Sequence, residues 1–292
     1  MKSIKEIISS LDKEFVQIIS KNEIEININD ELRENWKVKI DVKEWDNLIG
    51  PLEPGKIILL SGKTLSGINE FQYSLIQSIA IEKGYPVGVI LIELDSIYFI
   101  ERLVSKVGNF KPSPFIGLKD FPEEQIGKTF ETIVDKPIFI EDSLSVNINS
   151  LKDLILEFKN NGINIIFIDY LNFISFSNNN SLDHNVQEVA QLFHELKDLA
   201  VQLGVTIVIP AIIPKEYQNI FELTSWEKES INSIDTLVHL NHFYVKKETK
   251  ESLADGFIDI VDFIILKNKD RNLNKFSLVL DNKNFKSIVT LD

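Results

Sequence analysis

The stretch Ser61-Gly62-Lys63-Thr64-Leu65-Ser66-Gly67-Ile68-Asn69 decides how the rest of the chain is interpreted. Its glycines are spaced as in a phosphate-binding loop, Gly-x-x-x-x-Gly-Lys-Ser/Thr, but Ile68 and Asn69 follow where the lysine and the hydroxyl residue belong. An apolar run at 57–60 precedes the loop, and a segment with helical spacing at 70–83 follows it. This context predicts a phosphate site that lacks its main cation.

The loop should bind phosphate better than it supports hydrolysis. Backbone N–H groups at a helix N-terminus cradle phosphate without help from side chains. Ile68 offers neither charge nor hydrogen bond, and Asn69 offers Mg²⁺ only a neutral amide oxygen, so hydrolysis of ATP should suffer more than binding. Lys63 is an alternative source of charge, and an ordinary strand-to-helix turn is the structural alternative. The candidate nucleotide-binding residues are Gly62, Lys63, Thr64, Ser66, Gly67, Ile68 and Asn69.

Composition bounds the remaining possibilities. The chain has 292 residues, 44% hydrophobic and 26% charged, which is typical of a folded, soluble protein. It has no cysteine, which excludes disulfides and thiolate chemistry. Of its four histidines, His239 and His242 should face opposite sides of one strand, which argues against a metal site there. No apolar run approaches the roughly 20 residues of a membrane span, so a cytoplasmic location is expected. The net charge of −13 argues against non-specific electrostatic binding to nucleic acid.

The hydrophobic pattern divides the chain into two parts. Residues 1–40 hold an amphipathic helix at 3–20 and a polar connector, and residues 41–292 alternate apolar strands with helices. Such alternation predicts an α/β fold with a mostly parallel sheet, helices on both faces and antiparallel strands toward the C-terminus. Strands are expected at 57–60, 87–92, 138–140, 163–168, 205–209, 236–240, 258–266 and 276–280, and helices at 70–83, 97–107, 123–134, 150–160 and 186–203.

Acidic residues follow three of the expected strands. Glu93 follows the strand at 87–92, Glu141 and Asp142 follow 138–140, and Asp169 follows 163–168. Functional groups of parallel sheets gather at the carboxyl ends of the strands. An apolar strand that ends in Asp is typical of a Walker B carboxylate that holds Mg²⁺, so Asp169, with Asn69, is the candidate metal ligand. The alternative is that Glu93 and Asp169 are ordinary polar strand ends held by loop amides.

Four segments recur in an order typical of one family: Asp46-Asn47-Leu48-Ile49-Gly50-Pro51-Leu52-Glu53-Pro54-Gly55, Ile92-Glu93-Leu94-Asp95-Ser96, Ile140-Glu141-Asp142-Ser143 and Ile168-Asp169-Tyr170-Leu171-Asn172-Phe173. Through them, residues 45 to 292 resemble the carboxy-terminal RecA-like motor domain of the DnaB-type bacterial and phage replicative helicases. The resemblance implies a RecA-like P-loop core and, in the family, a ring hexamer that uses ATP and Mg²⁺ to move on single-stranded DNA. It also implies that Glu93 is the catalytic glutamate.

Departures from the family's pattern concern three parts of its machinery. Besides Ile68-Asn69 in the loop, Pro210-Ala211 replaces the Ser-Gln sensor of the γ-phosphate. The family's Lys-x-Arg element, whose arginine enters the neighbouring subunit's site, falls on Lys267-Asn268-Lys269. Lys267, Lys269 and Arg271 are therefore the candidate residues for this contact, although a lysine lacks the forked geometry of arginine. Together the departures predict impaired hydrolysis.

Partner surfaces follow from the same resemblance. The helix at 3–20 resembles a linker helix that packs on an adjacent motor domain; alternatively, it covers its own core. The segments expected to face DNA, 175–185 and 214–222, contain one basic residue, Lys215, and so should bind phosphate weakly. Nearby aromatic residues, Tyr217, Phe221 and Trp226, could stack on bases, but aromatic residues at such spacing more often pack inside the protein. Three functions remain: a helicase-like protein with weakened hydrolysis that acts by association with itself or with a replication or mobile-element protein, an active ATP-dependent helicase, or a nucleotide-binding regulator.

Overall fold

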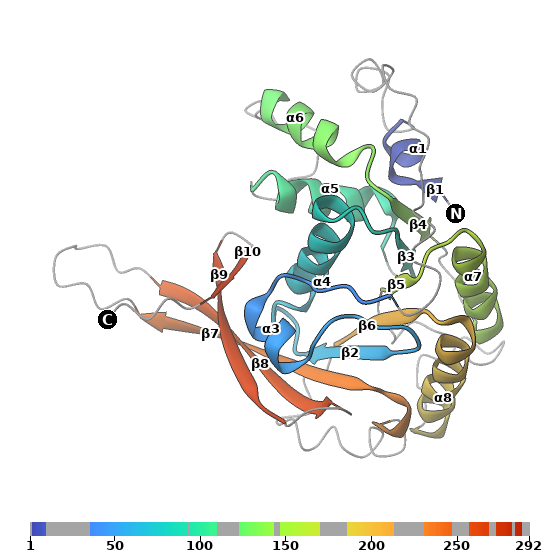
Figure 1. Cartoon of the computed structure of the whole chain (residues 1–292). Helices are drawn as coiled ribbons and strands as arrows, with labels where there is room; N and C mark the ends of the chain where they lie inside the picture. The colour runs from blue at the N-terminus through green and yellow to red at the C-terminus, as the bar shows by residue number, and fades with distance from the viewer. Residues whose placement is uncertain are drawn as a thin grey trace.

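The structure is a computed structural model of the chain that describes residues 2–9, 36–92, 94–109, 123–142, 147–169, 186–212, 231–246, 257–268, 273–281 and 284–287. Its centre is one ten-stranded sheet with the strand order β1-β4-β3-β5-β6-β2-β7-β8-β9-β10. Helices cover both faces, with α4 and α5 on one side and α7 and α8 on the other (Figure 1). The expected α/β class, with a mostly parallel sheet and helices on both faces, is confirmed.

The parallel part of the sheet consists of six strands whose carboxyl ends meet at one edge. Their residues are almost all apolar and are buried on both faces, as a parallel sheet between two helix layers requires. The strands are β2 (Ile57–Gly62), β3 (Val87–Leu91), β4 (Ile138–Asp142), β5 (Ile165–Ile168), β6 (Thr206–Ile212) and the start of β7 (Thr236–Lys246).

Antiparallel strands complete the sheet toward the C-terminus, as predicted. β7 pairs with β8 (Phe257–Asn268), β8 with β9 (Lys275–Asp281), and β9 with β10 (Asn284–Ser287). The register between β7 and β8 shifts once, at Leu237/Val238. The sequence pattern did not predict β10, because four residues are too few to show alternation.

The helices lie close to the predicted positions, with one change of type, except at 43–48 and 231–233, where no helix was predicted. They are α3 (Lys43–Leu48), α4 (Ile68–Ile76), α5 (Ser96–Val107), α6 (Glu123–Ile133), α7 (Ile148–Asn160) and α8 (Val186–Leu203), with a short 3₁₀ turn, η4 (Ile231–Ser233), before β7. The helix expected at 70–83 begins two residues earlier and changes into the π-helix η2 (Gln77–Glu82). Gln77 Nε2 donates to Glu82 Oε1 at 3.0 Å, which is the five-residue spacing of a π-turn.

The N-terminal segment packs on its own chain. β1 (Lys2–Ser3) adds an antiparallel edge strand to β4, and α1 (Ile4–Ser9) follows it. Glu6 accepts hydrogen bonds from Ser3 N at 2.7 Å and Ser3 Oγ at 3.0 Å, and Ser3 Oγ accepts from Glu6 N, which forms a capping box. Ile4 and Ile7 are buried in the same core as the main body, so the described part of the predicted helix covers its own core.

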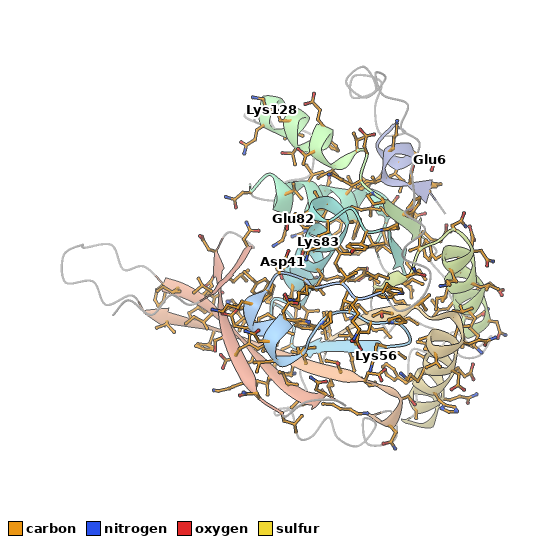
Figure 2. The ribbon with its side chains drawn as sticks, in the orientation of Figure 1. Glu6, Asp41, Lys56, Glu82, Lys83 and Lys128 are labelled. Carbon is orange, nitrogen blue, oxygen red and sulfur yellow. The ribbon has the colours of Figure 1, made fainter. Side chains whose placement is uncertain are left out.

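A second surface contact holds the connector before α3. Asp41 and Lys83 form an ion pair of 2.7 Å, and Lys83 Nζ also donates to Lys39 O. Both side chains lie between the connector and the turn after η2 (Figure 2). Ser78 Oγ of η2 donates to Ile40 O at 2.7 Å, so the π-helix receives the connector on its buried side as well. No helix among the described residues is long and apolar enough to span a membrane.

Candidate nucleotide site

The loop between β2 and α4 is built on two glycines that the structure requires. A β-carbon on Gly62 would lie 2.3 Å from Ser66 Oγ and 2.7 Å from Leu240 O, so no side chain fits there. Gly67 has φ 91° and is the N-cap of α4. A β-carbon there would lie 3.3 Å from Val261 Cγ2 of β8. The glycine frame therefore follows both from the tight turn and from close packing.

The first turn of α4 is anchored by aromatic packing. Phe71 is fully buried, and its ring centroid lies 5.2 Å from that of Trp45, 4.7 Å from Phe263 and 5.4 Å from Phe285. Its N–H donates to Gly67 O at 2.9 Å, which is the first bond of the helix. Backbone N–H groups ahead of that bond have no partner within the helix and point toward the loop, which gives an anion a favourable site.

Inside the loop, Ser66 provides a buried hydroxyl group that suits a phosphate oxygen. Its N–H donates to Lys63 O at 3.0 Å and closes a turn. Its hydroxyl is buried and has no hydrogen-bond partner among the described residues. A buried hydroxyl without a partner costs free energy, and a phosphate oxygen would provide the acceptor. The residues of the loop therefore fit a phosphate group.

The two residues that depart from the loop's usual pattern have different environments. Ile68 is 3% exposed, and its side chain belongs to the hydrophobic core on the α4 face. Asn69 is half-buried on the next position of the helix. Lys63 and Thr64 are exposed at the loop, and Leu65 between them and Ser66 has a φ of 66°. Lysine charge at this site can therefore come from Lys63 but not from position 68.

The strand order brings the other predicted residues to the same edge. β6 lies between β2 and β5, so Asp169, directly after β5, lies two strands from the loop, roughly 10 Å across the sheet. Asp169 is buried, and its N–H donates to Ile90 O at 2.8 Å. Glu93 follows β3, the next strand beyond β5, but lies outside the described residues. Carboxylate and amide oxygens of Asp169 and Asn69 are ligands that Mg²⁺ prefers.

The other acidic strand end has a structural role. Asp142 Oδ2 accepts a hydrogen bond from Ser96 N at 3.3 Å, and Asp95 caps α5 by accepting from Tyr98 N at 2.7 Å. Asp142 therefore satisfies a backbone N–H in the first turn of α5, which is a structural role. Because β4 lies beyond β3, Asp142 and Glu141 are also farther from the loop than Asp169.

The predicted contacts with a neighbouring subunit are only partly described. Lys267 lies on β8 opposite Leu237, whereas the loop end of β2 pairs with Leu240, which lies opposite Phe263. Lys267 is therefore about four residues along β8 from the loop, near the opposite end of the sheet, and is far from its own site. Lys269, Arg271 and both segments predicted to face DNA, with Tyr217, Phe221 and Trp226, lie outside the described residues.

One buried polar side chain at the loop was not predicted as a site residue. His239 of β7 is 8% exposed, and its Nδ1 lies 3.3 Å from Ser61 Oγ of β2. Burial, assisted by the positive charge of Lys63, lowers the pKa of His239 to about 4, so the ring is neutral near pH 7. The sequence contains a weak signal, since His239 interrupts the apolar residues of the strand expected at 236–240, but its place beside the loop follows from the register alone.

Comparisons with known proteins agree with this geometry. The glycine loop between a buried strand and a helix, with an acidic strand end two strands away, defines a RecA-like P-loop domain. The family model described as "DnaB-like helicase C terminal domain" matches residues 38–220. The chain belongs to this family, and the resemblance seen in the sequence is confirmed.

Relatives and solved structures support the same assignment. The chain is 27% identical over 168 residues to a probable plasmid replicative DNA helicase of Chlamydia psittaci, covering 54% of this chain and 34% of that protein. It is 23% identical over 261 residues to replicative DNA helicase DnaC of Bacillus subtilis (strain 168), covering 85% and 55%. The chain thus spans less than two thirds of the length of these relatives.

Two solved structures share the fold. One, described as an ATPase domain, superposes with a TM-score of 0.72 at 17% identity, covering 88% of this chain and 93% of that one. A DnaB-like replicative helicase, described together with its interactions with primase, gives a TM-score of 0.71 at 19% identity, covering 88% and 63%. At these identities the superpositions establish the fold and leave the activity of this chain to its own residues.

Proposed function

We propose that this chain is a DnaB-type helicase domain that holds a nucleotide in its glycine loop, hydrolyses it poorly and acts by association. Its partners would be copies of itself or another protein of a replication or mobile-element complex. One of the solved relatives is described with primase, which supports a partner of the replication machinery. Binding of single-stranded DNA stays a prediction about segments outside the described residues.

The buried side chain of Ile68 carries this proposal. In the family this position holds a lysine, and here it holds an isoleucine that packs into the core. A residue in this position cannot neutralise charge that develops on a phosphate, and loss of one such electrostatic contact typically slows a reaction about 10²–10³-fold. Ala211 at the former sensor position and lysines in place of the trans arginine extend the loss.

Binding of phosphate requires less than hydrolysis does. The backbone of the loop, the buried hydroxyl of Ser66 and the exposed Lys63 would hold the phosphates, and Asn69 and Asp169 would hold Mg²⁺. The metal, when bound, would screen the repulsion between the Asp169 carboxylate and the phosphates. The same residues would orient the nucleotide but offer it no lysine from the helix.

A second candidate function has one observation in its favour. Lys63 is exposed on the loop itself, and its positive charge adds to the effect of burial in lowering the pKa of the nearby His239. A lysine in that place is able to approach a bound phosphate and restore part of the missing charge. The competing proposal is therefore an ATPase or helicase with residual activity that depends on Lys63.

Two measurements on purified protein separate these functions. Hydrolysis of ATP with Mg²⁺ should be about 10²-fold or more below that of an active relative such as the Bacillus subtilis helicase, with and without single-stranded DNA. Turnover within about tenfold of the relative's, lost in both Lys63→Ala and Glu93→Gln, would establish the competing proposal and overturn ours.

Binding is tested separately by a thermal shift with a non-hydrolysable ATP analogue and Mg²⁺. We expect the analogue to raise the melting temperature of the unaltered chain. Thr64→Glu should abolish the rise, because Thr64 is exposed on the loop and an acid there repels phosphate. Thr132→Glu, on the exposed side of α6, is the matched control and should retain the rise. Absence of any shift in the unaltered chain would leave association without nucleotide as the function.

A further inference from the structure

Three side chains form a row across the sheet directly below the phosphate loop. The register pairs Ser61 of β2 with Ala211 of β6 on one side and with His239 of β7 on the other. Laterally paired residues of parallel strands point to the same face, so all three share the face that α8 covers farther down. All three side chains are buried, and Ser61 directly precedes Gly62, the first glycine of the loop.

Ala211 in this row departs from the family's pattern, and His239 in the same row is a polar side chain. Ala211 stands where the resemblance implies a glutamine that contacts the γ-phosphate, and its methyl group cannot donate a hydrogen bond. His239 lies in the same row on the other side of β2, so the two positions flank the strand that carries the loop, each roughly 4.8 Å from it. A polar ring therefore lies beside the loop on the strand opposite Ala211.

The hydrogen bond between Ser61 and His239 bears on what the ring can donate. Ser61 Oγ lies 3.3 Å from His239 Nδ1 and 3.5 Å from Val238 O. When the hydroxyl donates to Nδ1, the shorter of the two contacts, the neutral ring carries its proton on Nε2 and is a hydrogen-bond donor without positive charge. A neutral N–H is the same kind of donor as the glutamine amide. Lys63 acts on the same ring from the loop.

We propose that His239 contacts the terminal phosphate of a nucleoside triphosphate held by the loop and takes the place of the side chain that Ala211 lacks. This inference rests on the proposed function, since it assigns a residue to the same site. His239 would then be the group that distinguishes a triphosphate from a diphosphate, with Ser61 as the positioning residue that fixes its tautomer. In the alternative, His239 only fills the core and is satisfied by Ser61.

Calorimetric titration with AMP-PNP and with ADP, each with Mg²⁺, tests the assignment. His239→Phe keeps a ring of similar size but has no donor, so we expect affinity for AMP-PNP to fall about tenfold, as for the loss of one hydrogen bond to a charged group, and affinity for ADP to change less than twofold. His239→Gln supplies an amide donor and should keep most of the preference. Ala211→Gln combined with His239→Phe should restore it from the other side of β2.

A structural role would give a different result. Equal losses for the two nucleotides, or no loss in His239→Phe, would overturn the assignment while the proposed function stands. An unaltered chain that binds neither nucleotide would overturn both. Should His239→Phe fail to fold, the unaltered chain still decides the matter: with four histidines, its ¹⁵N ring spectrum is simple, and the His239 signals should move with AMP-PNP and stay in place with ADP. Identical shifts with both nucleotides would count against the proposal.

Discussion

At the scale of single residues, the loop contains an uncommon backbone conformation at Leu65. This leucine has φ 66° and is 86% exposed, and a residue with a β-carbon in the left-handed region costs about 1 kcal/mol or more. Asparagine tolerates this conformation better, so Leu65→Asn should raise the free energy of unfolding by about 0.5–1 kcal/mol in urea. Leu65→Ala, which removes the same exposed side chain but keeps the strain, should gain much less. Equal gains would show that exposure and not strain is responsible.

His239 predicts how stability depends on pH. Its pKa is lowered from 6.5 to about 4 in the folded chain, so the unfolded chain binds the proton first as the pH falls. Stability is therefore full above about pH 6.5 and declines between pH 6.5 and 4. Between pH 7 and pH 5, this group should lower the free energy of unfolding by about 1–2 kcal/mol.

The measurement for His239 is urea unfolding at pH 7 and pH 5. His239→Gln should lose less stability on acidification than the unaltered chain, by that amount. His194→Gln is the matched control, because His194 lies exposed on α8, and it should follow the unaltered chain. Identical pH profiles for His239→Gln and the unaltered chain would mean that the ring is not held neutral.

At the scale of elements, a partly buried ion pair joins α8 to the start of β2. Lys197 Nζ donates to Asp235 Oδ2 and to Gly55 O, each at 2.6 Å, and Ile57 N donates to the same carboxylate oxygen at 2.8 Å. Asp235→Asn keeps an acceptor for Ile57 but leaves the charge of the partly buried lysine without its partner. We expect a cost of about 1–3 kcal/mol in the free energy of unfolding.

A double-mutant cycle tests this ion pair. Lys197→Met combined with Asp235→Asn removes both charges, so it should be less destabilising than Asp235→Asn alone. Additive losses in the cycle would show that the two side chains do not interact, and would contradict the geometry. Because the pair lies at the end of β2 away from the loop, none of these variants should change the preference for AMP-PNP over ADP.

Most elements could be predicted from apolar spacing, and the exceptions have physical reasons. β1 is two residues long and its pairing with β4 uses backbone groups, so no side-chain pattern marks it. The π-helix keeps the apolar spacing of the helix before it, and its wider turn leaves no sign in the sequence. Strand ends could be placed at one edge, which brought Asp169 toward the loop. The register could not be predicted, and only the register places His239 beside Ser61.

At the scale of the whole molecule, the sheet separates two kinds of surface. The carboxyl ends of the parallel strands form the edge that holds the loop, His239 and Asp169, while Lys267 lies near the opposite end. The resemblance implies that Lys267 reaches a neighbour's site, and its distance from its own loop does not conflict with that prediction. The arrangement is therefore compatible with an assembly in which sites form between copies, and association remains part of the proposal.

The packing of the N-terminal segment predicts whether the protein needs such an assembly to be stable. Ile4 and Ile7 are buried in the core of their own chain, so Ile4→Ala and Ile7→Ala should each cost about 2–5 kcal/mol. If these contacts form within one chain, the urea midpoint of the unaltered protein should not depend on protein concentration. Lys5→Ala, at a half-exposed position of the same helix, is the control and should change stability by less than about 0.5 kcal/mol. A midpoint that rises with concentration, and loses that dependence in Ile4→Ala, would show instead that the segment packs on a neighbouring copy.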